Sequence, residues 1–166
     1  MQILFEELRD VLQDELKLYE EMYNLTVKKT DVIINGKISD LDNITHLENS
    51  IILKLGQLET RREKVVINIQ EQLGVKKDST ISDILNYIDD KDEIKQELDS
   101  ITKKLLDVLN SIKERNDLNG LLIKDTLEYI ELNINLLTSA TDKGIYNNKI
   151  QKEQSSQNIS LFDTKA

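Results

Sequence analysis

The chain of 166 residues contains no cysteine, no proline and no tryptophan, and it has only five glycines. Without cysteine there is no disulfide and no thiolate metal site, which fits a reducing compartment. Without proline, and with glycine rare, almost nothing in the sequence interrupts a helix. With only two Phe among the core-forming aromatics, the core must be built from aliphatic side chains. These absences favour an all-α fold.

Long apolar runs are also missing. The longest, such as residues 65–67 and 121–123, fall far short of the ~20 residues needed to cross a bilayer. The amino terminus, residues 1–7, is acidic and amphipathic, whereas a signal peptide has a basic region followed by an apolar block. We therefore expect a cytoplasmic protein that does not insert into a membrane.

The signatures of catalysis and of metal or cofactor binding are absent from the sequence. The single histidine, His46, has no Asp or Glu three residues before it, so the Glu-x-x-His motif of di-iron bundles is missing. The glycines are isolated, which excludes a phosphate-cradling loop, and no nucleophile, base and orienting group come together. We expect no enzymatic activity, no metal and no cofactor.

The net charge of −9 lies mainly on the predicted helical body. Binding to DNA or RNA needs a basic face, so nucleic acid is not an expected partner. The acidic surface either serves only solubility or also suits basic protein clients, and both interpretations stay open at this stage.

The most informative stretch runs from residue 90 to residue 140. Its apolar residues recur at steps of three and four, the spacing of one helical face. A single helix of this length spans about 75 Å at about 1.5 Å per residue, so it must lie along other helices. The residues of this face are Ile94, Leu98, Ile101, Leu105, Leu109, Ile112, Ile123, Leu127, Ile130, Ile134 and Leu137.

The segment Asn116–Gly120 tests this interpretation, because Asn-Gly is a strong turn dipeptide. Ile112, Asn116, Asn119 and Ile123 keep the helical spacing across it, so we predict an unbroken helix. The two asparagines then either form a buried polar layer that fixes register, as in coiled coils, or serve in binding. Gly120 costs about 1 kcal/mol relative to Ala, which predicts a close backbone approach or a mild bend there.

Three further helices are predicted, over residues 2–35, 40–73 and 80–88. The first should end at a left-handed cap at Asn35-Gly36. The second should begin with Ser39, Asp40 and Asp42 as candidate caps and end at Gly74, and the short one should close the bundle. The first two are joined by a few residues and should form an antiparallel hairpin. The predicted fold is an all-α, elongated antiparallel bundle of three long helices and one short helix over residues 1–140.

Residues 141–166 are polar, with sparse apolar side chains, and we predict a mobile tail. The tail either remains disordered or orders on a partner through Ile145, Tyr146, Leu161 and Phe162. On the helix before it, a second apolar strip offers further candidates for partner binding: Leu122, Tyr129, Leu132 and Leu136. The alternative is that both strips of this helix pack on the first two helices.

Several segments occur together in one order along the chain: the acidic start of the first helix, Asn35-Gly36 followed by Asp40-Leu41, Leu58–Glu63, Glu114–Leu122, Leu127–Tyr129, Gly144–Tyr146 and Ser160–Asp163. This order resembles the FlgN family of flagellar export chaperones. The block Glu114–Leu122 and the tyrosine-containing tail are the most specific, and Gly120 departs from the family pattern, which has a bulkier polar residue there.

The resemblance implies a cytoplasmic chaperone that binds the hook-associated junction proteins FlgK and FlgL, prevents their premature assembly and delivers them to the flagellar export apparatus. A long helix with excess apolar surface can cover a client helix as a groove partner. The alternative is a structural or scaffolding coiled coil, in which the same strips serve self-association in a homodimer.

Overall fold

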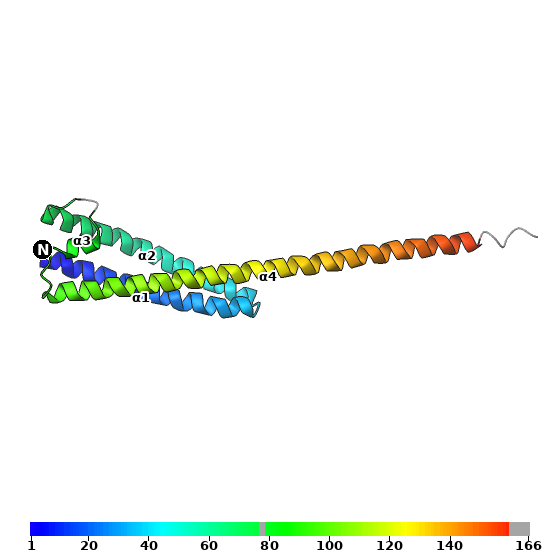
Figure 1. Ribbon diagram of the computed structural model, residues 1–166, viewed down its shortest axis with the longest axis horizontal. Helices are drawn as coiled ribbons and strands as arrows, with labels where there is room; N and C mark the ends of the chain where they lie inside the picture. Colours follow the sequence, from blue (N-terminus) through cyan, green and yellow to red (C-terminus); the bar gives the residue numbers. More distant parts are fainter. Residues whose placement is uncertain (77–78, 160–166) are drawn as a thin grey trace, which may run out of the picture. The chain divides into compact units, whose positions relative to one another are not determined.

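The computed structural model describes the backbone of residues 1–76 and 79–159 and the side chains as far as Thr138, apart from residues 77 and 78. It contains three long helices and one short helix, and no strand occurs in these ranges, which confirms the predicted all-α class (Figure 1). The helices are α1 (Gln2–Ile34), α2 (Ile38–Leu73), α3 (Ile81–Leu85) and α4 (Glu93–Ile159).

The chain forms two compact units, Met1–Leu122 and Ile123–Ala166, and their boundary lies within α4. The sequence had placed a boundary at residue 140, where the helix was expected to end. The helix instead continues to Ile159. The polar composition after residue 140 does not stop it, because that stretch contains no proline to break a helix. The mobility predicted for residues 141–166 stays a prediction.

In the first unit, α1 and α2 form an antiparallel hairpin, as predicted. The ion pairs between them show the direction. Arg62 Nε lies 3.5 Å from Glu15 Oε1, and Lys29 Nζ lies 2.8 Å from Glu48 Oε2. A later position on α1 is therefore paired with an earlier position on α2, so the two helices are antiparallel.

Helix α4 runs parallel to α1 with an almost constant register. Arg9 Nη1 donates to Glu97 Oε2 at 3.2 Å, and the Thr30 hydroxyl donates to Asn119 Oδ1 at 2.7 Å. The separations along the chain are 88 and 89 residues. The register therefore brings the end of α1 at Ile34 beside the last residues of α4 within the first unit, which ends at Leu122.

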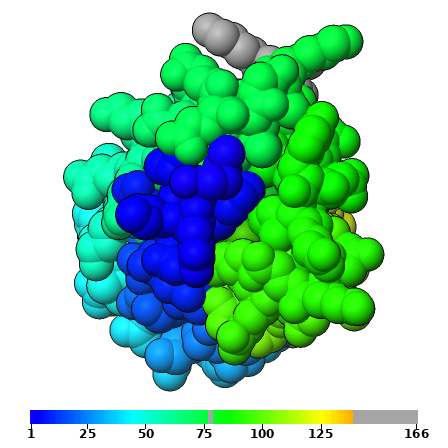
Figure 2. Space-filling model, turned by 90° about the vertical axis from the view of Figure 1, so that its left-hand side faces the viewer, coloured from blue at the N-terminus to red at the C-terminus, as the bar shows by residue number. Residues whose placement is uncertain are grey.

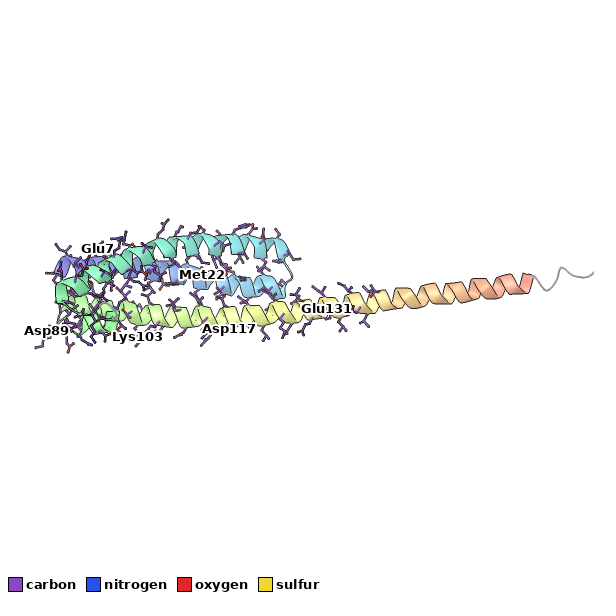
Figure 3. The ribbon with its side chains drawn as sticks, turned by 90° about the horizontal axis from the view of Figure 1, so that it is seen from above. Glu7, Met22, Asp89, Lys103, Asp117 and Glu131 are labelled. Carbon is purple, nitrogen blue, oxygen red and sulfur yellow. The ribbon has the colours of Figure 1, made fainter. Side chains whose placement is uncertain are left out.

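The core of the first unit consists of two apolar clusters. The larger joins all four helices at the end that holds the amino terminus, and Figure 2 shows the start of α1 (blue) bordered by the green surface of the later helices. The smaller lies between α1 and α2, with Met22 in it (Figure 3) and Ile112 of α4 packed against it. Members of the larger cluster are Phe5, Leu8, Leu12, Val65, Ile69, Ile84, Leu85, Ile94, Leu98, Ile101 and Leu105.

Glu15 is buried between α1 and α2, with only 3% of its surface exposed. Desolvation by burial raises the pKa of the Glu15 carboxyl, the positive charge of Arg62 opposes that rise, and Glu59 adds to it. Because desolvation is the largest cause, the ionised form of Glu15 is disfavoured in the folded chain despite its ion pair. The pKa of the Tyr19 hydroxyl is also raised, by burial and by the Glu15 charge.

Glycine ends the first two long helices as the sequence predicted. Gly36 has φ 64° and Gly74 has φ 66°, the left-handed conformation that favours glycine. The predicted start of α2 was wrong. The helix begins at Ile38, because the Lys37 carbonyl already accepts from the Leu41 N–H at 3.0 Å as the chain leaves the Gly36 turn. Ser39 and Asp40 lie inside the first turn and do not cap it.

The short helix α3 closes one end of the first unit. Thr80 and Asp83 form a capping box at its start, with the Thr80 hydroxyl accepting from the Asp83 N–H at 3.2 Å. The helix was predicted to reach residue 88 but ends at Leu85, because the following N–H groups of Tyr87 and Ile88 turn back to carbonyls only three residues earlier. Helix α4 starts at Glu93, later than the predicted residue 90, with Asp92 Oδ1 accepting from the Ile94 N–H at 3.1 Å.

Candidate partner-binding surface

Asn119 holds α4 to α1 at the end of the first unit. It is only 3% exposed. Its Nδ2 donates to the Thr26 carbonyl at 3.0 Å, and its Oδ1 accepts from the Thr30 hydroxyl at 2.7 Å. One amide thus bonds two positions of α1 that lie one helical turn apart, which fixes the register of the two helices. The prediction of a buried polar layer is confirmed for Asn119.

The same prediction was wrong for Asn116, which is exposed. Helix α4 continues unbroken through this block, as predicted. The expected close backbone approach at Gly120 is also wrong, because a Cβ atom built there meets no atom within 4 Å. The structure gives Gly120 no packing role.

Beyond this anchor, the apolar face that was buried in the first unit continues but is exposed. Ile94, Leu98, Ile101 and Leu105 are at most 9% exposed. The residues that repeat their spacing later in α4, here called the first strip, are between 47% and 70% exposed. The first strip consists of Leu127, Ile130, Ile134 and Leu137.

A second strip lies on another side of the same helix, and it contains three of the predicted partner-binding residues. Tyr129 is 67% exposed, Leu132 57% and Leu136 61%. The alternative that both strips pack on α1 and α2 stays open, because residues 127–137 lie in the second unit and α1 and α2 in the first. An exposed apolar surface that is continuous along a helix is typical of a site for a partner.

The other predicted binding residues divide into three cases. Leu122 is half-buried at the end of the first unit. The side chains of Ile145 and Tyr146 lie outside the described residues, although the backbone there is helical. Leu161 and Phe162 lie wholly outside the described residues, so the predicted role of all four tail residues remains untested.

Carboxylates border the two strips. Asp125 precedes Tyr129 by one helical turn, and Glu131, labelled in Figure 3, follows Leu127 by one turn. Glu128 lies 3.8 Å from Lys124 in a solvent-exposed pair. Three acidic residues against one lysine give the edge of this surface a negative charge.

The sequence interpretation missed the first strip as a binding surface, because its spacing is identical to that of the buried residues before it. Nothing local distinguishes Ile130 from Ile101. The available signal was the length of the helices: α1 has 33 residues and α2 has 36, whereas α4 has 67. Helices of half the length cannot cover the whole of α4.

Metal-binding clusters and membrane-spanning helices are both absent from the described part of the chain. No group of three or more His, Cys, Asp or Glu there is arranged to hold a metal ion. His46 is exposed on α2, 3.6 Å from the exposed Asp42. None of the described helices has the length and apolarity to cross a membrane.

A helical bundle whose longest helix carries two exposed apolar strips defines a protein-binding module. Comparison with known proteins identifies it further. The family model described as FlgN protein matches residues 1–154, so the chain belongs to the FlgN family, and its general role is that of a flagellar export chaperone.

A curated relative gives a second comparison. The chain is 29% identical over 150 residues to the uncharacterized protein YvyG of Bacillus subtilis (strain 168), and the match covers 90% of this chain and 91% of that protein. No solved structure matches the chain.

Proposed function

We propose that the chain is a cytoplasmic chaperone of the hook-associated junction proteins of the FlgK and FlgL type, and that it delivers them to the flagellar export apparatus. The observation that carries this proposal is the exposure of both strips on α4. Junction proteins assemble through terminal helices, and a chaperone must cover those helices until export. An exposed apolar helix face is suited to that task, because a client helix can lay its own apolar face against it.

The energetics are adequate for a reversible complex. Fully burying a Leu or Ile side chain is worth about 1.5–3 kcal/mol. The strips offer several such side chains on two sides of one helix. Part of this gain is offset by the loss of freedom on association, which leaves an affinity that permits release at the export apparatus.

Residues 141–166 form the second part of the proposed contact. Ile145, Tyr146, Leu161 and Phe162 are the apolar side chains that would extend the surface. The continuation of α4 to Ile159 supports this role, because it keeps Ile145 and Tyr146 on the same helix as the strips.

A binding experiment tests the proposal. The C-terminal segment of a junction protein is titrated into the intact chain and into a chain that ends at residue 140. We expect a complex with the intact chain and weaker binding by the shortened one. Absence of a complex with both forms would refute the proposed function, and equal affinities would remove only the tail from the contact.

A further inference from the structure

The apolar surface of α4 is too wide for one partner helix. At about 100° per residue, the centres of the first and second strips lie roughly 150° apart around the helix. The two strips together span about 220° of its circumference, whereas a helix packing on one side uses an apolar stripe of about 100°. A single docked helix therefore leaves one strip in water.

Both strips are equally available. Leu127, Ile130 and Ile134 of the first strip are 60%, 47% and 54% exposed. The three residues of the second strip are exposed to a similar extent, between 57% and 67%. Because the two strips are exposed to a similar extent, a partner has the same reason to bury either one.

The chain's own C-terminal residues cannot cover the strips. Residues up to Ile159 belong to the same helix and extend away along it. The last seven residues span at most about 25 Å when fully extended. Leu137 lies about 33 Å before Ile159 along the helix, at about 1.5 Å per residue.

A second copy of the chain is disfavoured by charge. It would bring its own Asp125, Glu128 and Glu131 towards the same three carboxylates of the first copy, and like charges placed together oppose association. Among the described residues, neither Asp125 nor Glu131 takes part in an ion pair, so both carboxylates are available to lysine or arginine of a partner.

We propose that the strips dock two amphipathic helices of the client at once, one on each side of α4, and that each client helix carries Lys or Arg beside its apolar stripe. This inference rests on the proposed function. It adds that the bound state is a bundle of at least three helices with α4 in the middle, in place of a simple helix pair.

Site-specific labels test the number of helices, because the natural chain has no cysteine and one introduced cysteine gives one labelled site. A nitroxide is attached to Ile134→Cys in the first strip, Leu132→Cys in the second strip, or Asn135→Cys on the polar face as the matched control. The probe is the C-terminal segment of a FlgK-type junction protein, and size-exclusion chromatography records complex formation separately from label mobility.

With the complex formed, we expect several-fold slower motion of the labels at both Ile134→Cys and Leu132→Cys, and unchanged motion at Asn135→Cys. Immobilisation of only one strip label overturns the inference but leaves the proposed function intact. Loss of the complex on labelling one strip, with the Asn135→Cys complex retained, assigns that strip to the contact. Failure of the unlabelled natural chain to bind refutes the proposed function, and the inference with it.

A separate experiment tests the claim that the client helices carry Lys or Arg beside their apolar stripes. The double variant Asp125→Lys/Glu131→Lys should bind the probe at least tenfold more weakly, and the natural complex should weaken as salt is added. Unchanged affinity in the variant overturns the requirement for basic client edges. Glu114→Lys, an exposed substitution in the first unit, serves as the control for a charge change elsewhere on α4.

Discussion

The Thr30 hydroxyl donates to Asn119 Oδ1 at 2.7 Å, joining α1 to α4 near the last point at which the two helices run together. The Asn119 amide also donates to the Thr26 carbonyl, so both ends of the amide are satisfied by α1. Buried amides that lack partners are costly, and any slip of α4 along α1 would leave this one unpaired. The contact therefore sets where coverage of α4 by α1 ends.

Replacing this asparagine should destabilise the first unit. We expect Asn119→Ala to lower the free energy of unfolding by about 1–3 kcal/mol, since it removes two buried hydrogen bonds and leaves the Thr30 hydroxyl with only the Thr26 carbonyl, 3.2 Å away. The free energy of unfolding is measured by urea denaturation monitored by circular dichroism. Asn116→Ala, exposed three residues earlier, is the matched control and should change stability by less than about 0.5 kcal/mol. Equal effects would contradict the register role of Asn119.

Two glycine substitutions should act in opposite directions. Gly120→Ala should stabilise the chain by about 1 kcal/mol, because the position is helical and the added methyl group meets no atom within 4 Å. Gly74→Ala should destabilise it by about 1–2 kcal/mol, because Gly74 has φ 66°. Thermal unfolding of both variants is the measurement. A destabilised Gly120→Ala protein would reveal a constraint that the packing does not contain.

Glu15 should make stability fall as pH rises. Its pKa in the folded chain is raised above the ordinary value of 4.5, so the folded state binds the proton more tightly than the unfolded state. The destabilising effect of Glu15 is absent at pH values below its ordinary pKa and complete at pH values above its raised pKa in the folded chain. The Glu15→Gln protein should therefore be more stable than the natural chain at neutral pH, and the difference should shrink towards acidic pH.

The Glu15→Gln protein must be compared with the natural chain at each pH, because other carboxylates change the stability of both proteins with pH in the opposite direction. Hydrogen bonds from Thr80 lower the pKa of Asp83, and the contact with Lys95 lowers that of Asp90, so their stabilisation is lost as pH falls. These contributions cancel between the Glu15→Gln and natural chains. A stability difference that does not change with pH, or a less stable Glu15→Gln protein at neutral pH, would contradict the assignment.

The free chain should be a monomer. Sedimentation equilibrium should give a mass near 19.2 kDa over a wide range of concentrations, because the acidic edge opposes pairing of two copies through α4. A stable dimer in which Leu132→Asn/Leu136→Asn restores the monomer would instead support the scaffolding alternative.

Local signals in the sequence predicted most of the fold. The helical spacing and the glycines after α1 and α2 act within a few residues, so each could be recognised without knowledge of its surroundings. The start of α2 was mispredicted because a backbone turn at Gly36 made the side-chain caps at Ser39 and Asp40 unnecessary.

The candidate site was harder to predict, because exposure depends on distant partners. Asn116 and Asn119 both have the spacing of the apolar face, and only the positions of Thr26 and Thr30 decide which one is buried. Ile130 and Ile101 likewise share the spacing of the apolar face, but Ile130 is 47% exposed and Ile101 only 6%. Comparing the lengths of α1, α2 and α4 would have identified the exposed part of α4, but the spacing of its apolar residues could not.

The central claim is that the strips of α4 hold the client, and paired substitutions test it most directly. The junction-protein segment is titrated by calorimetry into the natural chain, into Leu132→Asn/Leu136→Asn, and into the control Ile52→Asn/Leu53→Asn on α2. The control residues are 55% and 72% exposed, comparable with 57% and 61% in the strip, so apolar groups of equal size and similar exposure are removed from both surfaces.

The account predicts at least a tenfold loss of affinity, about 1.4 kcal/mol or more, for the strip variant, and an unchanged affinity for the α2 control. Equal affinities for the natural chain and the strip variant would contradict it.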